Sequence, residues 1–168
     1  EGIIADFPVK SLHWIFRSEQ FENENDAAYF LHRYNFSTVV STKESDRLYF
    51  EPLERGDFYI DGVPQIERFG DARFYKYYQT LKSDLTSADK NIYSYNFSMN
   101  PGKVDPEGSL NMSGFSSNKT FFSFLMKAKA SSEAIEQVDT SRDFTIHAYA
   151  YGYQILEISD SRASLSFL

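Results

Sequence analysis

The sequence is 168 residues long, and its 42% hydrophobic and 24% charged residues exclude a disordered tail, while its length favours a single domain. The formal net charge of -7 argues against a surface that binds nucleic acid through phosphate contacts, and the absence of cysteine excludes disulfides and thiolate metal sites. Because 17% of the residues are aromatic, including 16 Phe and 12 Tyr, the composition favours a mostly β-stranded fold.

The N-terminal part of the sequence predicts a strand followed by a loop. Residues 9–17 alternate in polarity and place Leu12, Trp14 and Phe16 on one face, which is typical of a half-buried strand. Residues 18–28 are rich in Glu and Asn and show no such period, so we expect an exposed surface loop there.

Alternating polarity predicts three further strands in the first half of the chain, over residues 33–40, 48–50 and 58–60. The last of these ends at Asp61-Gly62, a dipeptide suited to the positive φ angles of a tight hairpin turn. Pro64 follows and disfavours a central strand, because proline has no N–H to donate to a ladder.

One short helix is predicted over residues 71–85. Phe74, Tyr78 and Leu81 recur there at helical spacing behind Asp71, whose side chain is suited to capping the first turn. A second segment, residues 128–138, resembles either a small helix or a long loop.

The second half of the sequence contains the strongest strand patterns. Residues 91–99 alternate without a break until Asn100-Pro101-Gly102 stops them. Residues 120–126 are apolar at nearly every position, which predicts a strand covered on both faces. The remaining expected strands are residues 109–114, the long segment 144–158 and the short segment 163–167. Seven to nine short strands with few helices predict an antiparallel sandwich or barrel, and the jelly roll is one such fold.

Three stretches, in this order, resemble the C-terminal domain of the major capsid proteins of nucleocytoplasmic large DNA viruses. The first is residues 7–17, which contain Pro8-Val9-Lys10 and Trp14. The second joins residues 92–101 to 106–113, and the third joins residues 146–156 to 163–167. The resemblance covers almost the whole chain and implies an all-β, antiparallel jelly-roll β-sandwich with one or two short helices in its loops.

The residues that carry this resemblance also have a physical reading of their own. In Asn100-Pro101 and Pro106-Glu107-Gly108, proline restricts φ and glycine permits a positive φ, so the segment can turn sharply and set the register of adjacent strands. Short polar side chains at Asn111 and Ser113 can bond the neighbouring backbone. The full set expected to hold the structure is Pro8, Val9, Lys10, Trp14, Tyr93, Ser94, Asn100, Pro101, Pro106, Gly108, Ser109, Asn111 and Ser113.

The resemblance implies a structural protein rather than an enzyme, with no cofactor and no metal. Residues 1–168 are expected to form a single jelly-roll domain that lacks its first strand and the N-terminal jelly roll of the family. In that family a homotrimer forms a pseudo-hexagonal capsomer, and capsomers tile an icosahedral shell together with minor capsid proteins over an inner membrane. The expected location is the virion, after assembly in the host cytoplasm and without direct contact with nucleic acid.

Two alternatives stay open. A minor or penton capsid protein that reuses one jelly roll would be shorter than the two-domain family protein. A carbohydrate-binding β-sandwich would use Tyr149, Tyr151 and Tyr153 as a sugar platform, although such a row is more often one wall of the sandwich. The aperiodic segments 18–26 and 128–143 are the expected variable, exposed or contact-making loops.

No motif indicates catalysis or nucleotide binding. The glycines form no phosphate loop, the serines form no nucleophile pattern, and structural roles are expected for the separated histidines His13, His32 and His147. Four asparagines begin Asn-x-Ser/Thr sequons, which a secreted protein would use as glycan attachment sites. In a shell that assembles inside the cell, we expect them to be ordinary polar residues of strands without glycans. They are Asn35, Asn96, Asn111 and Asn118.

Overall fold

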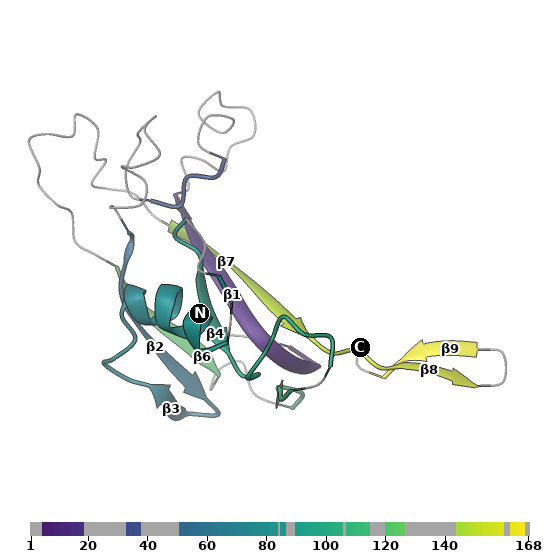
Figure 1. Ribbon diagram of the computed structural model, residues 1–168. Helices are drawn as coiled ribbons and strands as arrows, with labels where there is room; N and C mark the ends of the chain where they lie inside the picture. The colour runs from purple at the N-terminus through teal and green to yellow at the C-terminus, as the bar shows by residue number, and fades with distance from the viewer. Residues whose placement is uncertain are drawn as a thin grey trace, which may run out of the picture.

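The computed structural model describes residues 5–18, 33–37, 51–83, 85–86, 90–105, 107–114, 120–126, 144–159 and 162–166. These residues form nine strands and one helical segment (Figure 1). The strands are β1 (Pro8–Ser18), β2 (Leu53–Ile60), β3 (Val63–Ile66), β4 (Tyr93–Asn96), β5 (Leu110–Asn111), β6 (Phe121–Met126), β7 (Phe144–Gly152), β8 (Leu156–Ser159) and β9 (Arg162–Leu165). The helical segment is a π-helical turn, η2 (Phe74–Tyr78), continued by α3 (Gln79–Lys82).

The strands form a two-layer body and a separate hairpin. In the first sheet β1 lies between β4 and β7, and its N-terminal end also pairs with β5. In the second sheet β2 lies between β3 and β6. Every pairing is antiparallel, so the predicted antiparallel sandwich is confirmed for the body. The β8–β9 hairpin extends away from that body (Figure 1).

Aromatic side chains around Trp14 fill the space between the two sheets. The Trp14 ring lies 4.6 Å from the ring of Phe122 and 5.0 Å from that of Tyr75, centroid to centroid. Phe58 of β2 stacks on Phe122 at 4.3 Å. All four side chains are buried, and aromatic pairs at these distances add to the free energy gained by burial. The high aromatic content of the chain therefore builds the core.

β1 confirms the strand predicted at residues 9–17. Leu12, Trp14 and Phe16 are buried against the second sheet, whereas His13 and Ile15 lie between them on the outer, half-buried face. The period of two in the sequence is therefore the period of burial in the structure.

The hairpin turn predicted at Asp61-Gly62 is present and joins β2 to β3. Asp61 and Gly62 have φ angles of 48° and 80°, as a two-residue turn with two left-handed positions requires. Pro64 lies in β3, which is at the edge of the described sheet, where a missing N–H is tolerated.

The predicted helix is present but shorter than residues 71–85, and the side that it buries carries Lys76 and Gln79 beside the core residues Ala72 and Tyr75. The Asp71 carboxylate accepts a hydrogen bond from the N–H of Phe74 at 2.7 Å, which confirms the predicted cap. Lys76 and Gln79 are buried, whereas Leu81 is exposed. The apolar spacing thus predicted the helix without identifying its packed face.

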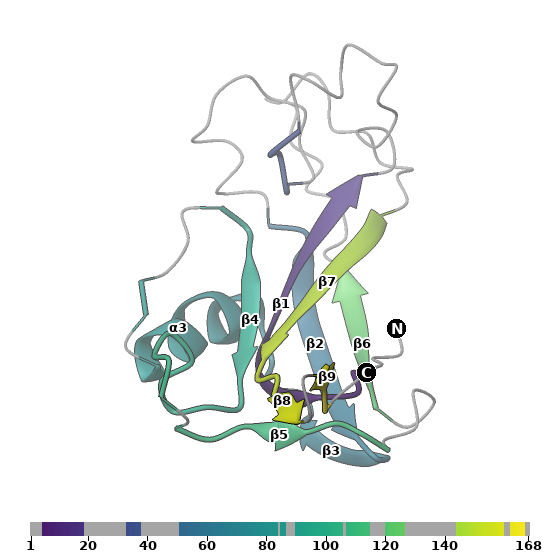
Figure 2. The same cartoon turned by 90° about the vertical axis from the view of Figure 1, so that its right-hand side faces the viewer.

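Hydrogen bonds from the helical segment reach both sheets. The Tyr75 hydroxyl donates to the carbonyl of Gly56 in β2, and the Gln79 side-chain oxygen accepts from the N–H of Asn96 in β4 at 3.1 Å. Asn96 also donates through Nδ2 to the Gln79 carbonyl at 2.8 Å. The helical segment lies beside β4 and covers that side of the sandwich (Figure 2).

Several strand predictions were wrong or too long. Residues 33–37 form a turn instead of a strand, because Asn35 Oδ1 accepts bonds from the N–H and the hydroxyl of Ser37 at 3.2 and 2.7 Å. Such local bonding competes with a sheet ladder. β4 and β5 are shorter than the predicted strands 91–99 and 109–114.

Two other corrections concern β6 and the C-terminal strands. β6 has Ser123 and Leu125 exposed, so it is covered on one face and not on both. The single strand predicted at 144–158 is two strands, β7 and β8. The segment predicted at 163–167 corresponds to β9. Of the loop expected at 18–28, Ser18 is the last residue of β1 and the rest lies outside the described residues, as do the expected loop at 128–143 and the expected strand at 48–50.

Candidate assembly surfaces

A buried lysine joins β1, the turn after β4 and the end of β7. We call Lys10, Lys103, Asp105, Tyr151 and Tyr153 the Lys10 junction. Lys10 is 1% exposed; its Nζ donates to the Lys103 carbonyl and lies 5.1 and 4.8 Å from the ring centroids of Tyr151 and Tyr153. The Tyr153 hydroxyl donates to the Asp105 carbonyl at 3.3 Å. Two aromatic faces and a carbonyl offset the cost of burying the ammonium group, so these contacts tie the three segments together.

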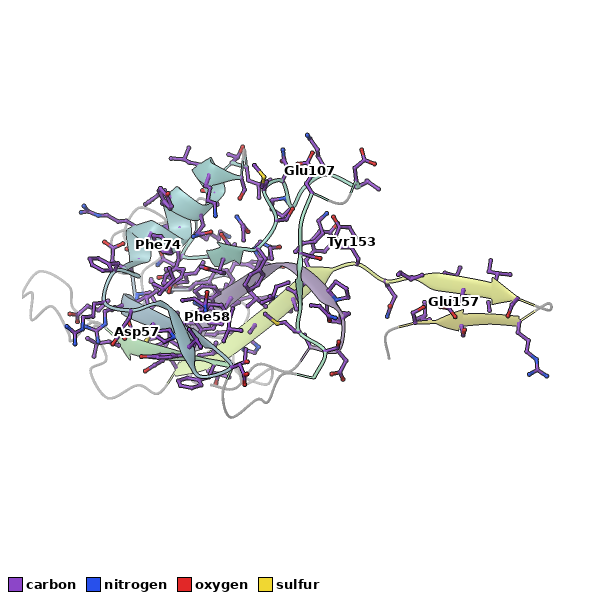
Figure 3. The ribbon with its side chains drawn as sticks, turned by 90° about the horizontal axis from the view of Figure 1, so that it is seen from below. Asp57, Phe58, Phe74, Glu107, Tyr153 and Glu157 are labelled. Atoms are coloured by element: carbon purple, nitrogen blue, oxygen red, sulfur yellow. The ribbon has the colours of Figure 1, made fainter. Side chains whose placement is uncertain are left out.

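The backbone explains why β7 ends beside this junction. The N–H of Tyr153 donates to the carbonyl of Pro8 at 2.9 Å. Gly152 lies so close to that carbonyl and to the Phe7 ring that a Cβ would overlap both. Only glycine therefore fits at the end of β7, and the chain leaves the sheet there towards the hairpin. Figure 3 shows Tyr153 at the root of the hairpin and Glu157 out along it.

The predicted turn between β4 and β5 is held by a hydrogen bond to β1 and by one within the turn itself. The N–H of Phe97 donates to the Lys10 carbonyl at 2.9 Å, and the N–H of Met99 donates to the Glu107 carbonyl at 3.2 Å. Gly108 has a φ of 108°, a conformation that favours glycine. Asn100 and Pro101 lie in this turn, whereas Pro106 lies outside the described residues.

The other residues that carry the resemblance lie in the sandwich body. Trp14 and Tyr93 pack in the core with ring centroids 6.1 Å apart, and the Ser94 hydroxyl donates to the Tyr75 carbonyl at 3.3 Å. Val9 is fully buried in β1. The structure therefore places these residues in the packing of the two sheets.

Asn111 and Ser113 lie where β5 leaves the first sheet. Asn111 is opposite Pro8 in the ladder, and its Oδ1 accepts bonds from the N–H and the hydroxyl of Ser113 at 3.0 and 2.8 Å. Ser109 precedes β5 and is exposed. The predicted residues thus divide into a core group and a group around the Lys10 junction and β5.

The C-terminal half of β7 is exposed on the face that belongs to the core. Leu12 and Trp14 of β1 point into the core, and their ladder partners on β7 are Ala150 and Ala148. Residues directly opposite each other in an antiparallel pair share a face, so these two alanines also point inwards. Both are nevertheless exposed, and no described strand pairs with the outer edge of β7. The sandwich is therefore open along the C-terminal half of β7, whereas Phe144 and Ile146 in its N-terminal half pack against the core.

The tyrosine row lies on the other face of β7. Tyr149 and Tyr151 are opposite His13 and Ser11, and they are 60% and 52% exposed. They are not part of the wall that faces the core, which corrects the expectation for this row. Lys10 Nζ approaches the ring of Tyr151, so this ring is not free on both sides to stack on a sugar.

The β8–β9 hairpin has one apolar and one polar face. Its register pairs Leu156 with Leu165 and Ile158 with Ala163, which places these four residues on one face. The opposite face carries Glu157, Ser159, Arg162 and Ser164. Every residue of both strands is exposed. The apolar face is therefore uncovered in this chain.

The described residues contain no cluster of three His, Cys, Asp or Glu side chains suited to a metal ion. The His13 ring lies 2.8 Å from the Ser11 hydroxyl, and burial lowers the pKa of His13. His147 lies opposite Ile15 in the ladder, and His32 lies outside the described residues. Across the same described part of the chain, no helix is long and apolar enough to cross a membrane.

The sequon asparagines differ in their surroundings. Asn35 and Asn96 are 0% and 3% exposed, so neither side chain has room for a glycan in the folded chain. Asn111 is exposed, although its side-chain oxygen is engaged by Ser113. Asn118 lies outside the described residues.

The buried ion pair of Lys76 and the break at Gly152 were not among the predicted features. Lys76 Nζ bonds Glu51 and Asn91, both at 2.9 Å, and these partners are 25 and 15 residues away along the chain. No local pattern reveals such a pair. A glycine inside an alternating aromatic run was a signal for the break, because glycine within a strand often marks a close backbone approach.

Comparison with known protein families matches nearly the whole chain. A family model described as large eukaryotic DNA virus major capsid protein matches residues 5–164. No curated protein sequence matches the chain.

Solved structures of viral capsid proteins share the fold. PBCV-1 VP54, fitted into a reconstruction of the virophage Sputnik, has a TM-score of 0.66 and 16% identity over 99% of this chain and 45% of its own. A chain of the PBCV-1 capsid model has a TM-score of 0.69 and 17% identity over 100% of this chain and 45% of its own. The Faustovirus major capsid protein has a TM-score of 0.56 and 14% identity over 87% of this chain and 30% of its own. The fold is thus the expected jelly roll, and the chain spans less than half the length of these solved chains.

Proposed function

Because this chain belongs to the family of large eukaryotic DNA virus major capsid proteins, we propose that it builds an icosahedral shell as part of a homotrimeric, pseudo-hexagonal capsomer. That it is a structural protein of the viral capsid follows from the family itself. The observation that carries the proposal is the match over residues 5–164 together with the two-layer antiparallel body. Its role is geometric: rigid sheets form a wall, and no reaction is assigned to it.

The jelly-roll domain is completed by chain outside residues 1–168. A jelly roll has eight strands in two sheets, and an unpaired strand edge is a liability that proteins normally cover. An additional strand along the outer edge of β7 would pair its nine residues and cover Ala148 and Ala150. The solved capsid chains, of which this chain covers 45%, are long enough to hold such a strand and a second, N-terminal jelly roll.

Exposed apolar side chains on the body support contacts with other copies and with minor capsid proteins. Leu81 on α3 and Met99 in the turn after β4 are each 76% exposed, and Tyr78 on η2 is 57% exposed. Aromatic residues and methionine are enriched in protein interfaces, where a few buried anchors provide most of the binding energy. These residues are the proposed anchors between neighbouring copies within and between capsomers.

The proposed setting is the virion, with assembly in the host cytoplasm next to an inner membrane that the protein does not enter. A net charge of -7 supports the absence of direct contact with the genome, because phosphate groups attract basic surfaces. Labelling of infected cells with an antibody against this chain is expected to mark cytoplasmic assembly sites. Labelling confined to the nucleus would contradict this part of the proposal.

The composition of purified virions tests the function. Peptides of this chain are expected in the most abundant capsid band, at a mass about twice 19.4 kDa or more, and a reconstruction of the particle should show three copies per capsomer. A minor or penton capsid protein, the alternative, would appear in a scarce band of single-domain mass. Absence of the peptides from the particle would refute both.

A further inference from the structure

The β8–β9 hairpin exposes an apolar face to solvent, which is unfavourable. Leu156, Ile158 and Leu165 are 58%, 73% and 43% exposed on one side of a two-stranded sheet. An isolated two-stranded hairpin is at best marginally stable in water, and it normally needs further strands or a packed apolar face. The separation of polar and apolar residues onto opposite faces indicates that one face is meant to be covered and the other to remain in solvent.

The body of this chain does not provide the cover. The hairpin projects away from the two sheets, and Glu157 lies well outside the body in Figure 3. In the ladders of the described residues, β8 and β9 pair only with each other. The partner therefore lies outside this sandwich.

The root of the hairpin, at Gly152 and Tyr153, is held to β1. Gly152 is pressed against Pro8, and the N–H of Tyr153 donates to the Pro8 carbonyl at 2.9 Å. The Tyr153 ring also covers Lys10 Nζ, and the N–H of Ser166 donates to the Ile155 carbonyl at 2.9 Å. The N-terminal end of the hairpin is thus anchored to β1, and its C-terminal end is bonded to that N-terminal end, which lowers the entropy lost when the apolar face docks.

The size of the face decides which kind of partner can hold it. The apolar face consists of Leu156, Ile158, Ala163 and Leu165, whereas a stable interface between separate proteins uses about 20–30 residues on each side. Four residues suffice when the partner is already tethered, because a tether replaces a bimolecular step by an intramolecular one at high effective concentration. More than half of each solved capsid chain lies outside the region that matches this one, which leaves room for a tethered domain.

We propose that the apolar face of the β8–β9 hairpin packs against a second domain of the same polypeptide and so locks the two domains together. This rests on the proposed function only in requiring the longer polypeptide of a two-domain capsid protein. The polar face of Glu157, Ser159, Arg162 and Ser164 stays in solvent.

Photo-crosslinking of the full polypeptide tests the contact and identifies the partner. A photoreactive amino acid replaces Ala163 on the apolar face or, as the matched control, Ser159 on the polar face. The Ala163 probe is expected to give an intrachain crosslink, which keeps the monomer mass on a denaturing gel and maps to residues outside 1–168. The Ser159 probe should give at least about fivefold less of this product. A product of doubled mass would assign the face to a second copy, and no product would leave it in solvent; either result overturns the proposal.

Hydrogen exchange gives a second readout that needs no probe. The amides of residues 156–165 in the full wild-type polypeptide should exchange at least about tenfold more slowly than in the Ile158→Asp variant, because a charge on the apolar face prevents docking. Ser159→Asp, which places the same side chain on the polar face beside Arg162, should keep the wild-type rate. Fast exchange in the wild-type polypeptide would refute the docking. If the hairpin amides exchange fast in a polypeptide that still forms the shell, only the docking of the hairpin is rejected. If they exchange slowly in a protein that is absent from the shell, only the capsid function is rejected.

Discussion

Replacement of Trp14 by alanine tests whether the aromatic cluster between the sheets holds the domain together. Trp14 is 1% exposed and contacts rings of both sheets and of the helical segment. Truncation of a buried Trp to Ala costs about 3–5 kcal/mol through lost burial and the cavity that remains. The indole N–H of Trp14 has no hydrogen-bond partner within the described part of the chain, and leaving a buried donor unpaired is itself unfavourable. Its removal offsets part of the loss, so we expect a destabilisation of about 3 kcal/mol.

Urea unfolding followed by far-UV circular dichroism measures this effect. Ile15→Ala is the matched control, because Ile15 is the next residue of β1 and points to the outer face; its loss should be below about 1 kcal/mol. Trp14→Phe removes the unpaired N–H while it keeps an aromatic ring, and should cost less than half as much as Trp14→Ala. Equal losses for Trp14→Ala and Ile15→Ala would refute the assignment of Trp14 to the centre of the core.

Three further substitutions probe the other buried features. Lys76→Met should lower the free energy of unfolding by about 3–5 kcal/mol, since it leaves the Glu51 carboxylate without its buried ion-pair partner; a loss below about 1 kcal/mol in thermal or urea unfolding would count against the pair. Gly152→Ala should destabilise by more than about 2 kcal/mol because a Cβ has no room beside Pro8, whereas Gly114→Asn, at an open site with a φ of 84°, should change little; similar urea midpoints for the two variants would contradict this. Burial lowers the pKa of His13 below its usual value of 6.5, so the unfolded chain binds the proton more readily and stability falls as the pH drops through 6.5. His13→Gln should therefore flatten the stability profile between about pH 7.5 and about pH 5.5, and an unchanged profile would reject that role for His13.

The local pattern of the sequence was sufficient to predict the elements whose conformation is set by residues close together in the chain. The alternation around Trp14 predicted β1, Asp61-Gly62 predicted the turn between β2 and β3, and Asp71 predicted the helix cap. Each depends on a period or on a backbone conformation that a few adjacent residues specify. The order of the three motif stretches was likewise enough to indicate the capsid family, which the family model confirms.

Tertiary structure alone decided which faces are covered. Lys76 is buried because Glu51 and Asn91 reach it from distant segments. The exposure of Ala148 on a core-facing position of β7, and of the apolar face of the β8–β9 hairpin, cannot be read from alternation. A period in the sequence specifies that a strand has two different faces, whereas the surface that meets each face is set by segments remote in the chain.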